Sequence, residues 1–330
     1  MRFLKVAGLV CLLAFAACTK SKPKQTFWIY TSLYKEVIAD MEKKLQSKFP
    51  DVDFKWYQSG SENVAARVNA ELGAGETLAD LLMTSDPFWY LELERAGHLM
   101  AYQSPNAKPI PDGFKEKSHA FVICRVPTVV MAYNKEAVPN PPKGWKDLLK
   151  PEWKGKVSMG SPLQSGTSFA AVAQLVRRYD WAYFQKLREN DLLSAGGNSA
   201  VITRMETKER PVGIVLLENV IDAQRKQSPI GVIYPEDGAI LAPSPIAIVK
   251  TTKHPELAQQ VYDYFLSDDM QEETVKGRMY SSIPTFRAPE GEKPFAEILA
   301  NSFPWNAEVL SDIYAKREDI KKRFMEVVLN

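Results

Sequence analysis

Strand-like and helix-like segments alternate three times in the first hundred residues, and this alternation limits the possible folds more than any other feature. The apolar run 26–30 is typical of a strand covered on both faces, and the helix after it carries its apolar stripe at Tyr34, Ile38, Met41 and Leu45. The further expected elements are a strand at 52–57, a helix through Val64, Val68 and Leu72, a strand at 79–83 and a helix at 89–95. This repeated pattern predicts an α/β domain with a parallel sheet.

Each of these three strands ends in a turn rich in Ser and Thr. The turns are Thr31-Ser32, Ser59-Gly60-Ser61 and Thr84-Ser85-Asp86. In open α/β sheets the turns at the carboxyl ends of the strands line the ligand crevice. The alternative is that the same residues only cap the helices that follow, which Ser, Thr and Asp commonly do.

A fourth turn of this kind runs from Ser161 to Ser168, between a strand-like piece at 156–160 and an amphipathic helix. Ser165 or Thr167 is a natural N-cap. A strand that leads through a Ser/Gly turn into a helix presents free N–H groups and the positive end of the helix dipole, which suits an anion. Here too, simple helix capping is the alternative interpretation.

Two long apolar stretches, 121–132 and 239–250, bracket a second α/β block. We expect the chain to cross there from one lobe to another and to return. The first lobe would then hold residues 26–122 and 240–330, including the C-terminal helices, and the second lobe residues 123–239.

The N-terminus has the features of a secretory signal over residues 1–17. Arg2 and Lys5 precede an apolar run that is too short to span a bilayer as a mature helix. The run ends Leu13-Ala14-Phe15-Ala16-Ala17-Cys18 and resembles a bacterial lipobox, with Phe15 where Leu is commonest. We therefore expect lipidation of Cys18 and a tether at 18–25. Cleavage by the ordinary signal peptidase is the alternative.

Charge and cysteines exclude several classes of function. The chain has 42 basic and 40 acidic residues, and removal of Arg2 and Lys5 with the signal leaves 40 of each. Bulk charge therefore gives no argument for a nucleic-acid partner. Cys124 would remain alone within an apolar run, which is typical of an inert buried thiol. No catalytic motif, P-loop or zinc spacing is visible, so we expect neither an enzyme nor a bound cofactor or metal.

Several segments together carry a resemblance to a known family. They are the lipobox-like start, Ile29-Tyr30-Thr31-Ser32, Ser59-Gly60-Ser61, Leu78-Ala79-Asp80-Leu81-Leu82, Met131-Ala132-Tyr133-Asn134-Lys135, Ser161-Pro162 with Ser165-Gly166-Thr167, Pro235-Glu236-Asp237-Gly238 and Ser244–Lys250. In order and spacing the chain resembles the periplasmic solute-binding proteins of ABC importers, in the two-lobed class that includes ferric-, phosphonate- and sugar-phosphate-binding proteins.

This resemblance implies a type II periplasmic-binding-protein fold. Each lobe would hold a mixed, mostly parallel sheet flanked by helices, and two crossing strands would join the lobes. The resemblance further implies a monomer that holds its ligand in the cleft, closes about a hinge and delivers the ligand to a membrane permease. A periplasmic sensor that signals to a membrane receptor would have the same architecture, so this alternative stays open.

The sequence departs from the iron-binding members of the family. Those members use adjacent tyrosines from the second lobe, where this chain has Leu217-Glu218-Asn219, and the first strand ends in Thr31-Ser32 without a histidine. Ferric iron is therefore the alternative ligand, with Tyr133 or Tyr234 as possible phenolate donors.

The expected cleft instead carries mostly neutral hydrogen-bonding groups. Hydroxyls and helix-start N–H groups can hold a phosphate or phosphonate, while the carboxylates would accept from hydroxyls or an amine of the ligand. Arg125 would either reach the anion or form a structural salt bridge. The predicted ligand-binding residues are Thr31, Ser32, Ser59, Gly60, Ser61, Ser85, Asp86, Ser165, Gly166, Thr167, Asn198, Ser199, Glu218 and Asp237. The predicted ligand is thus a small molecule with an anionic head and a polar or cationic body, such as an aminoalkylphosphonate or a phosphorylated sugar or alcohol.

Overall fold

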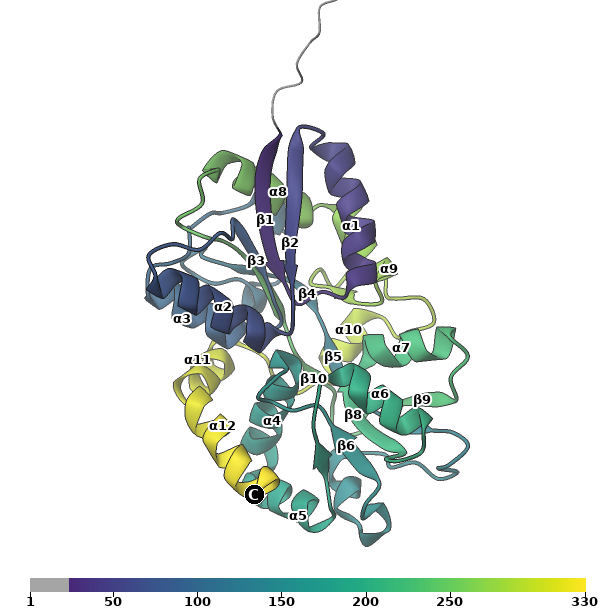
Figure 1. Cartoon of the computed structure of the whole chain (residues 1–330). Coiled ribbons are helices and arrows are strands. Elements are labelled where there is room, and N and C mark those ends of the chain that lie inside the picture. Colours follow the sequence, from purple (N-terminus) through teal and green to yellow (C-terminus); the bar gives the residue numbers. More distant parts are fainter. Residues whose placement is uncertain (1–23) are drawn as a thin grey trace, which may run out of the picture.

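The computed structural model describes residues 24–330, which form two lobes that are each built on a six-stranded sheet (Figure 1). The strand order is β12-β4-β11-β3-β1-β2 in the first lobe and β10-β5-β8-β6-β7 in the second, where β9 also pairs with β5. The strands of the first sheet are β1 (Gln25–Thr31), β2 (Val52–Gln58), β3 (Leu81–Met83), β4 (Val122–Val126), β11 (Ser244–Ile248) and β12 (Tyr280–Ser281). Those of the second are β5 (Thr128–Asn134), β6 (Val157–Met159), β7 (Leu193–Ser194), β8 (Val212–Leu216), β9 (Ile230–Ile233) and β10 (Ile240–Leu241). The predicted signal sequence, Cys18 and most of the tether lie outside the described residues.

Helices cover the sheets. They are α1 (Lys35–Lys48), α2 (Ser61–Gly73), α3 (Pro87–Arg95), α4 (Gly166–Tyr179), α5 (Trp181–Glu189), α6 (Asn198–Glu206), α7 (Leu217–Arg225), α8 (Pro255–Phe265), α9 (Asp268–Lys276), α10 (Phe295–Ala300), α11 (Ala307–Ala315) and α12 (Arg317–Phe324), which continues into a π-helical turn, η5 (Met325–Leu329). Short 3-10 turns are η1 (Pro105–Ala107), η2 (Asp112–Phe114), η3 (Trp145–Leu149) and η4 (Pro151–Trp153). Within residues 24–330, no helix combines the length and the apolar character needed to cross a membrane.

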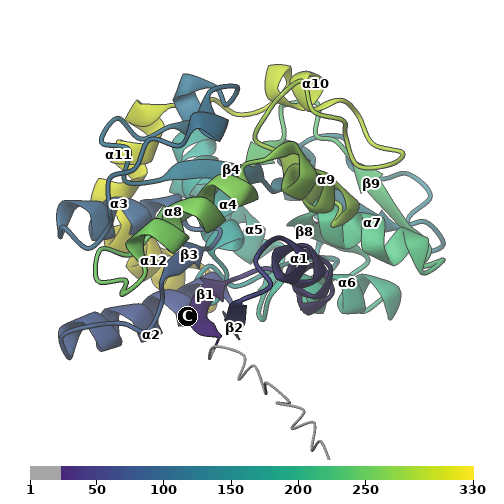
Figure 2. The ribbon, with the colours of Figure 1, turned by 90° about the horizontal axis from the view of Figure 1, so that it is seen from above.

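The alternation of side chains along β1 explains why helices pack on both faces of the first sheet. Phe27 and Ile29 pack in one hydrophobic cluster with the buried stripe of α1, and Tyr30 packs in another with the buried stripe of α2. Seen from above, α1 and α2 flank β1 and β2 on opposite sides (Figure 2). Each apolar side chain buried in this way stabilises the fold by roughly 1.5–3 kcal/mol. The predicted α/β class is therefore confirmed.

Both sheets are mixed as predicted, but antiparallel pairs outnumber parallel ones, and this corrects the expectation of mostly parallel sheets. The parallel pairs are β1-β2, β1-β3, β6-β7 and β6-β8. The antiparallel pairs include β4-β11 and β5-β10. In each of these two pairs, one strand carries the chain from the first lobe to the second and the other carries it back, so the two run in opposite directions.

Prolines mark both crossings between the lobes. Pro127 alone separates β4 from β5, and Ala242-Pro243 separate β10 from β11. Because proline cannot donate to a sheet ladder, each long apolar stretch is divided into one strand for each sheet. The two predicted crossing strands are thus present, while the exact division of the lobes at residues 122/123 and 239/240 stays a prediction.

The C-terminal helices contact both lobes rather than the first alone. Helix α11 packs on α3 in the first lobe, and η5 packs on α5 in the second. Figure 1 shows α11 and α12, in yellow, running along the side of the molecule from one lobe toward the other. This tail is therefore a further link between the lobes.

Candidate binding cavity between the lobes

A cavity of about 180 Å³ lies between the two lobes, where strands of both sheets end. The first lobe contributes the residues that follow β1, β2 and β3, together with Arg125 of β4. The second lobe contributes the starts of α4, α6 and α7. The lining residues are Ser32, Leu33, Tyr34, Gln58, Ser59, Gly60, Ser61, Ser85, Arg125, Gln164, Ser165, Thr167, Gly197, Asn198, Ser199, Leu216, Glu218 and Met279. Most of the residues predicted from the Ser/Thr-rich turns thus meet around one space.

Five helices begin at this cavity. The residues that precede α1, α2, α4, α6 and α7 all line it, namely Tyr34, Gly60, Ser165, Gly197 and Leu216. Only the helix after Ser165 has its first turn capped by a side chain, through a bond from the Ser168 N–H to Ser165 Oγ (3.3 Å). The other four starts have no side-chain cap, so their first N–H groups and dipoles are available to an anion.

Ser85 organises the hydroxyl groups of the first lobe. Its N–H donates to Ser32 Oγ and to Ser61 Oγ, both at 3.2 Å. Its own Oγ accepts from Ser244 Oγ at 2.8 Å and from Arg125 Nη2 at 2.9 Å. These bonds link four hydroxyl groups and one guanidinium, and of these groups those of Ser32, Ser61, Ser85 and Arg125 line the cavity.

A matching network lies in the second lobe. The hydroxyls of Ser165 and Thr167 are 3.0 Å apart, and Asn198 Nδ2 donates to Thr167 Oγ1 at 3.0 Å. Asn198 Oδ1 accepts from the Leu216 N–H at 3.3 Å, which ties the start of α6 to the end of β8. The two networks face each other across the cavity.

Two charged side chains line the cavity, Arg125 from the first lobe and Glu218 from the second, and both are buried. Burial raises the pKa of Glu218 to about 7, and the positive charge of Arg125 opposes that rise. Burial, together with the nearby Glu218, raises the pKa of Tyr34 to about 12, so its phenol stays protonated at neutral pH.

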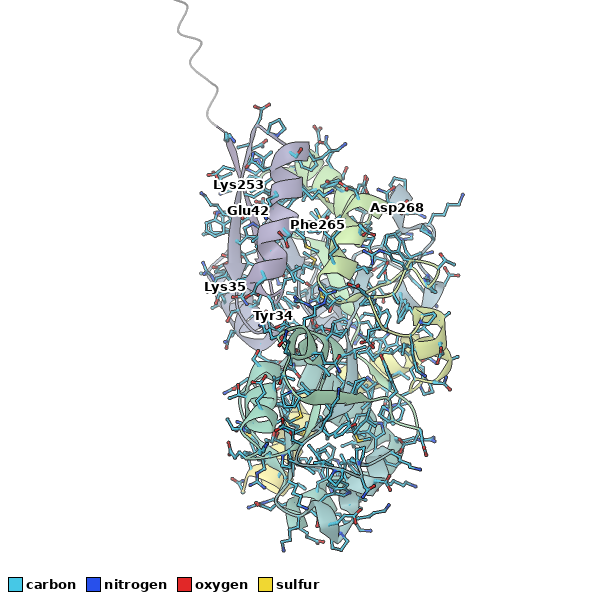
Figure 3. All side chains as sticks on the ribbon, turned by 90° about the vertical axis from the view of Figure 1, so that its right-hand side faces the viewer. Tyr34, Lys35, Glu42, Lys253, Phe265 and Asp268 are labelled. Atoms are coloured by element: carbon cyan, nitrogen blue, oxygen red, sulfur yellow. The ribbon has the colours of Figure 1, made fainter. Side chains whose placement is uncertain are left out.

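The lobes touch across this seam. The Tyr34 hydroxyl donates to Asn219 Oδ1 at 3.0 Å, and Figure 3 shows Tyr34 at the level where the two lobes meet. A Cβ placed on Gly60 would lie 2.8 Å from the carbonyl oxygen of Gln164, and one on Gly166 would lie 2.5 Å from that of Ser85. Glycine at these two positions therefore allows backbone from opposite lobes to approach closely.

The structure places four predicted site residues outside the lining of the cavity. Thr31 is fully buried, and its hydroxyl donates to the Met83 carbonyl at 2.8 Å. Asp86 is also fully buried; its carboxylate caps α3 by accepting from the Trp89 N–H and pairs with Arg317 at 2.6 Å. Both side chains are therefore bonded to other groups of the protein and stabilise the fold.

Gly166 and Asp237 are the other two. Gly166 begins α4, but it packs on the first lobe and does not line the cavity. Asp237 lies elsewhere in the second lobe, where it accepts from the Trp145 N–H at 3.1 Å and from the Tyr179 hydroxyl at 2.6 Å. Of the predicted ligand-binding residues, these four therefore do not line this cavity.

Sequence reasoning missed seven lining residues, namely Leu33, Tyr34, Gln58, Gln164, Gly197, Leu216 and Met279. The spacing of Tyr34 to Ile38 predicts that Tyr34 belongs to the apolar stripe of α1, and nothing in the sequence indicates that its hydroxyl would face a cavity. Gln58 and Gln164 directly adjoin predicted turn residues, so a wider window around each turn would have included them. Met279 lies outside the predicted turns; in the structure it lines the cavity, and its sulfur lies 3.2 Å from Arg125 Nη1.

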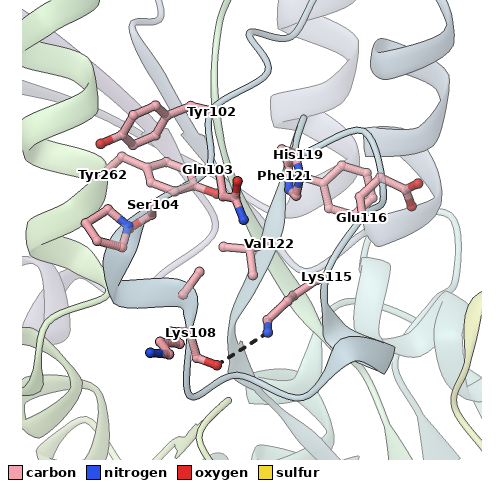
Figure 4. Close-up of a pocket in the computed structure, with 12 residues that line it drawn as sticks. Tyr102, Gln103, Ser104, Lys108, Lys115, Glu116, His119, Phe121, Val122 and Tyr262 are labelled. Carbon is pink, nitrogen blue, oxygen red and sulfur yellow. Dashed lines mark hydrogen bonds between the residues drawn. The ribbon is translucent and has the colours of Figure 1, made fainter.

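A larger hollow of about 490 Å³ in the first lobe shares no lining residue with this cavity. Its walls include Tyr102, Phe121 and Tyr262, and Lys108 and Lys115 also line it (Figure 4). It lies in one lobe only, so closure of the lobes does not form it.

Comparison with known proteins identifies the family. A family model described as bacterial extracellular solute-binding protein matches residues 76–308, which is more than two thirds of the chain. The chain belongs to this family. The matched region of this solute-binding protein includes Ser85, Arg125 and the whole second-lobe side of the cavity, while Ser32 and the turn Ser59–Ser61 precede it.

Solute-binding proteins of known structure share its fold. They include the periplasmic binding protein P5PA (20% identity, TM-score 0.81, covering 92% of this chain and 100% of that one). They also include AfuA from Actinobacillus pleuropneumoniae with exogenous fructose-6-phosphate bound (21% identity, TM-score 0.82, covering 92% of this chain and 99% of that one). A third is iron-bound HitA from Pseudomonas aeruginosa (19% identity, TM-score 0.78, covering 91% of this chain and 99% of that one). An uncharacterized protein of Haemophilus influenzae is 21% identical over 282 residues, 82% of this chain and 81% of that protein.

These comparisons confirm the two-lobed type II fold and the prediction of a solute-binding protein of ABC importers. Membership of this family implies a small-molecule ligand, a permease partner and a periplasmic location.

Proposed function

We propose that this solute-binding protein captures a small anion with a phosphoryl head, a phosphate ester or a phosphonate, in the interlobe cavity. The observation that carries the proposal is that five helix N-termini meet there beside Arg125, and four of these termini have no side-chain cap. Helix starts and a guanidinium are the groups that bind phosphoryl oxygens best in proteins.

The hydroxyl networks and the size of the cavity support a phosphoryl group on a small body. A phosphoryl head has three oxygens that accept hydrogen bonds, and hydroxyls of Ser32, Ser85 and Thr167 approach from both lobes. The cavity of about 180 Å³ is smaller than the roughly 300–1,000 Å³ that is typical of small-molecule sites. The solute is therefore small, and both lobes contact it, which favours the closed form.

The donor set favours this ligand over ferric iron, although iron-bound HitA shares the fold. Among the lining residues Tyr34 supplies the phenol and Glu218 the carboxylate, and the cation Arg125 would repel Fe(III). Within residues 24–330, no group of three or more His, Cys, Asp and Glu side chains is placed to hold a metal ion.

We further propose that the protein binds its ligand without covalent chemistry and that Cys18, which lies outside the described residues, anchors a monomer to the membrane. The lining residues include several hydroxyls but no His, Lys or Cys that would act as a base or a thiol nucleophile. Labelling cells with a radioactive fatty acid tests the anchor, because Cys18→Ala should abolish the label. A dimer in light scattering of the soluble chain would refute the monomer.

Thermal unfolding of the mature chain without Cys18 tests the ligand class. The panel holds inorganic phosphate, phosphonates, sugar phosphates, glycerol phosphates and Fe(III) with citrate. A ligand at 100 times its Kd stabilises the folded chain by about 2.7 kcal/mol, which raises Tm by several degrees. We expect such shifts with phosphoryl compounds. A shift with Fe(III) alone and a coloured complex would overturn the proposal.

Paired variants then place the binding site. Replacing Ser165 and Thr167 by Ala removes two hydroxyls from the cavity and should weaken binding by roughly 1–3 kcal/mol for each buried partner lost. Thr203→Ala is the matched control, because Thr203 is exposed on α6 and bonds only to the Ser199 carbonyl. Unchanged affinity in the double variant would place the anion elsewhere.

A further inference from the structure

The carboxylate of Glu218 is buried in the cavity wall without a partner from any other described residue. The residue is 6% exposed, and among the described residues no side-chain hydrogen bond or ion pair engages its oxygens. The backbone group that favours its charged form is its own N–H. An ionised carboxylate in this position is costly unless something in the cavity donates to it.

Arg125 does not meet this need. No ion pair of 4 Å or less joins its guanidinium to Glu218, although the two charges act on each other. Instead Nη2 donates to Ser85 Oγ at 2.9 Å, and Nη1 lies 3.2 Å from the sulfur of Met279. Arg125 is thus held on the first lobe, and its buried Nε has no partner.

Tyr34 and Asn219 do not donate to Glu218 either. The Tyr34 hydroxyl gives its proton to Asn219 Oδ1 at 3.0 Å, so its oxygen faces its surroundings as an acceptor. Glu218 and Tyr34 both line the cavity, and their charges influence each other. This part of the cavity therefore offers acceptors, whereas the helix starts and Arg125 offer donors.

We propose that Glu218, with the oxygen of Tyr34, holds a cationic amine of the ligand, so that the solute is a zwitterion with a phosphoryl group at one end and an ammonium group at the other. The inference rests on the proposed function, because the phosphoryl group occupies the helix starts and Arg125. Once that anion is bound, a hydroxyl could donate to Glu218 but would leave its charge unbalanced. An ammonium group supplies both donors and the balancing charge.

Three matched ligands test this assignment by isothermal titration: 2-aminoethylphosphonate, 2-hydroxyethylphosphonate and ethylphosphonate. On the mature wild-type chain we expect the amine to bind at least tenfold more tightly than the alcohol. Glu218→Gln keeps the shape and an acceptor but loses the charge, so the preference for the amine should fall below threefold. Glu206→Gln, an exposed position on α6, should keep it.

The pH dependence of this preference gives a second readout. The charged and titratable groups that face Glu218 are Arg125 from β4 and Tyr34 before α1, and the raised pKa of Tyr34, about 12, keeps its phenol neutral between pH 5.5 and 8. Because the pKa of Glu218 in the empty cavity is about 7, the ratio of amine to alcohol affinity should rise up to pH 7 and then level off. The ammonium group lowers the second pKa of the phosphonate in the amine relative to the alcohol, so the ratio measured on Glu218→Gln records the ligands' own titration. The wild-type ratio divided by the Glu218→Gln ratio should then rise up to pH 7 and level off.

The possible outcomes separate this inference from the proposed function. Similar affinity for all three ligands on the wild-type chain would overturn the amine assignment and leave the phosphoryl site standing. If neither these three ligands nor any other phosphoryl compound in the panel binds, both the amine assignment and the phosphoryl site are overturned. The wild-type comparison decides the matter even if the Glu218 variant fails to fold.

Discussion

Gly166→Ala should weaken ligand binding because it prevents full closure of the lobes. A Cβ at this position would lie 2.5 Å from the carbonyl oxygen of Ser85 and 3.1 Å from the Cβ atoms of Asp86 and Ser61. All three neighbours belong to the first lobe, and a backbone oxygen cannot turn aside. Ordinary contact begins near 3.4 Å, so the lobes would have to separate by roughly 0.9 Å (3.4 minus 2.5) at this point.

The magnitude follows from the cost of overpacking. One extra methyl group in a well-packed contact typically costs about 1–3 kcal/mol. Only the closed form bears this cost, since the contact joins the lobes. At about 1.4 kcal/mol for each factor of ten, affinity should fall by roughly 5- to 150-fold. Isothermal titration with a phosphoryl ligand measures the loss, and thermal unfolding without ligand should show a much smaller change.

Gly73→Ala is the matched control, because Gly73 ends α2 and a Cβ there would meet nothing within 4 Å. Its affinity should equal that of the wild-type chain. If Gly166→Ala binds ligand within twofold of the wild-type chain, the close approach of Gly166 and Ser85 is not part of the liganded state. If its unliganded Tm falls strongly, the strain lies within the fold rather than in closure.

Three further predictions concern buried groups. The pKa of Glu218 is about 7 in the folded chain and 4.5 ordinarily, so the folded chain holds this proton more tightly than the unfolded chain. The stability that Glu218 contributes therefore falls as the pH rises from 4.5 to 7, by roughly 3 kcal/mol in total. Urea unfolding from pH 4.5 to 8 should show this trend in the difference between wild type and Glu218→Gln; a constant difference would contradict it. Arg317→Met leaves Asp86 and Glu62 without the cation that pairs with both, and should lower the free energy of unfolding by about 3–5 kcal/mol. Arg287→Met, which breaks an exposed pair with Glu272, should cost under about 1 kcal/mol, and equal losses in the two variants would refute the distinction. Burial raises the pKa of Cys124 to about 12, so a thiol reagent at pH 8 should label the mature chain without Cys18 only after denaturation, and rapid labelling of the folded chain would show that the thiol is accessible.

The sequence predicted the first-lobe side of the cavity because strand ends that carry Ser and Thr gather at one edge of a parallel array. Ser32, Ser61 and Ser85 come together for that reason. The pairing of Asp86 with Arg317 could not be predicted, because a polar turn residue gives the same signal whether its partner is a ligand or a side chain more than 200 positions away in the chain. The apolar pattern could not predict whether the crossing strands pair parallel or antiparallel, because a continuous apolar run occurs in buried strands of both kinds.

The position of β11 in the first sheet sets the order in which the two sheets can be completed as the chain is synthesised. This strand lies between β3 and β4, yet it begins only at Ser244, long after both neighbours have been made. Until then β3 and β4 each have an open edge, which is prone to pair with another chain. All strands of the second sheet fall between Thr128 and Leu241, so that sheet needs no segment from elsewhere. During synthesis the second sheet can therefore be completed before the first, and a chain that stops before β11 would contain all strands of the second sheet and an unfinished first one.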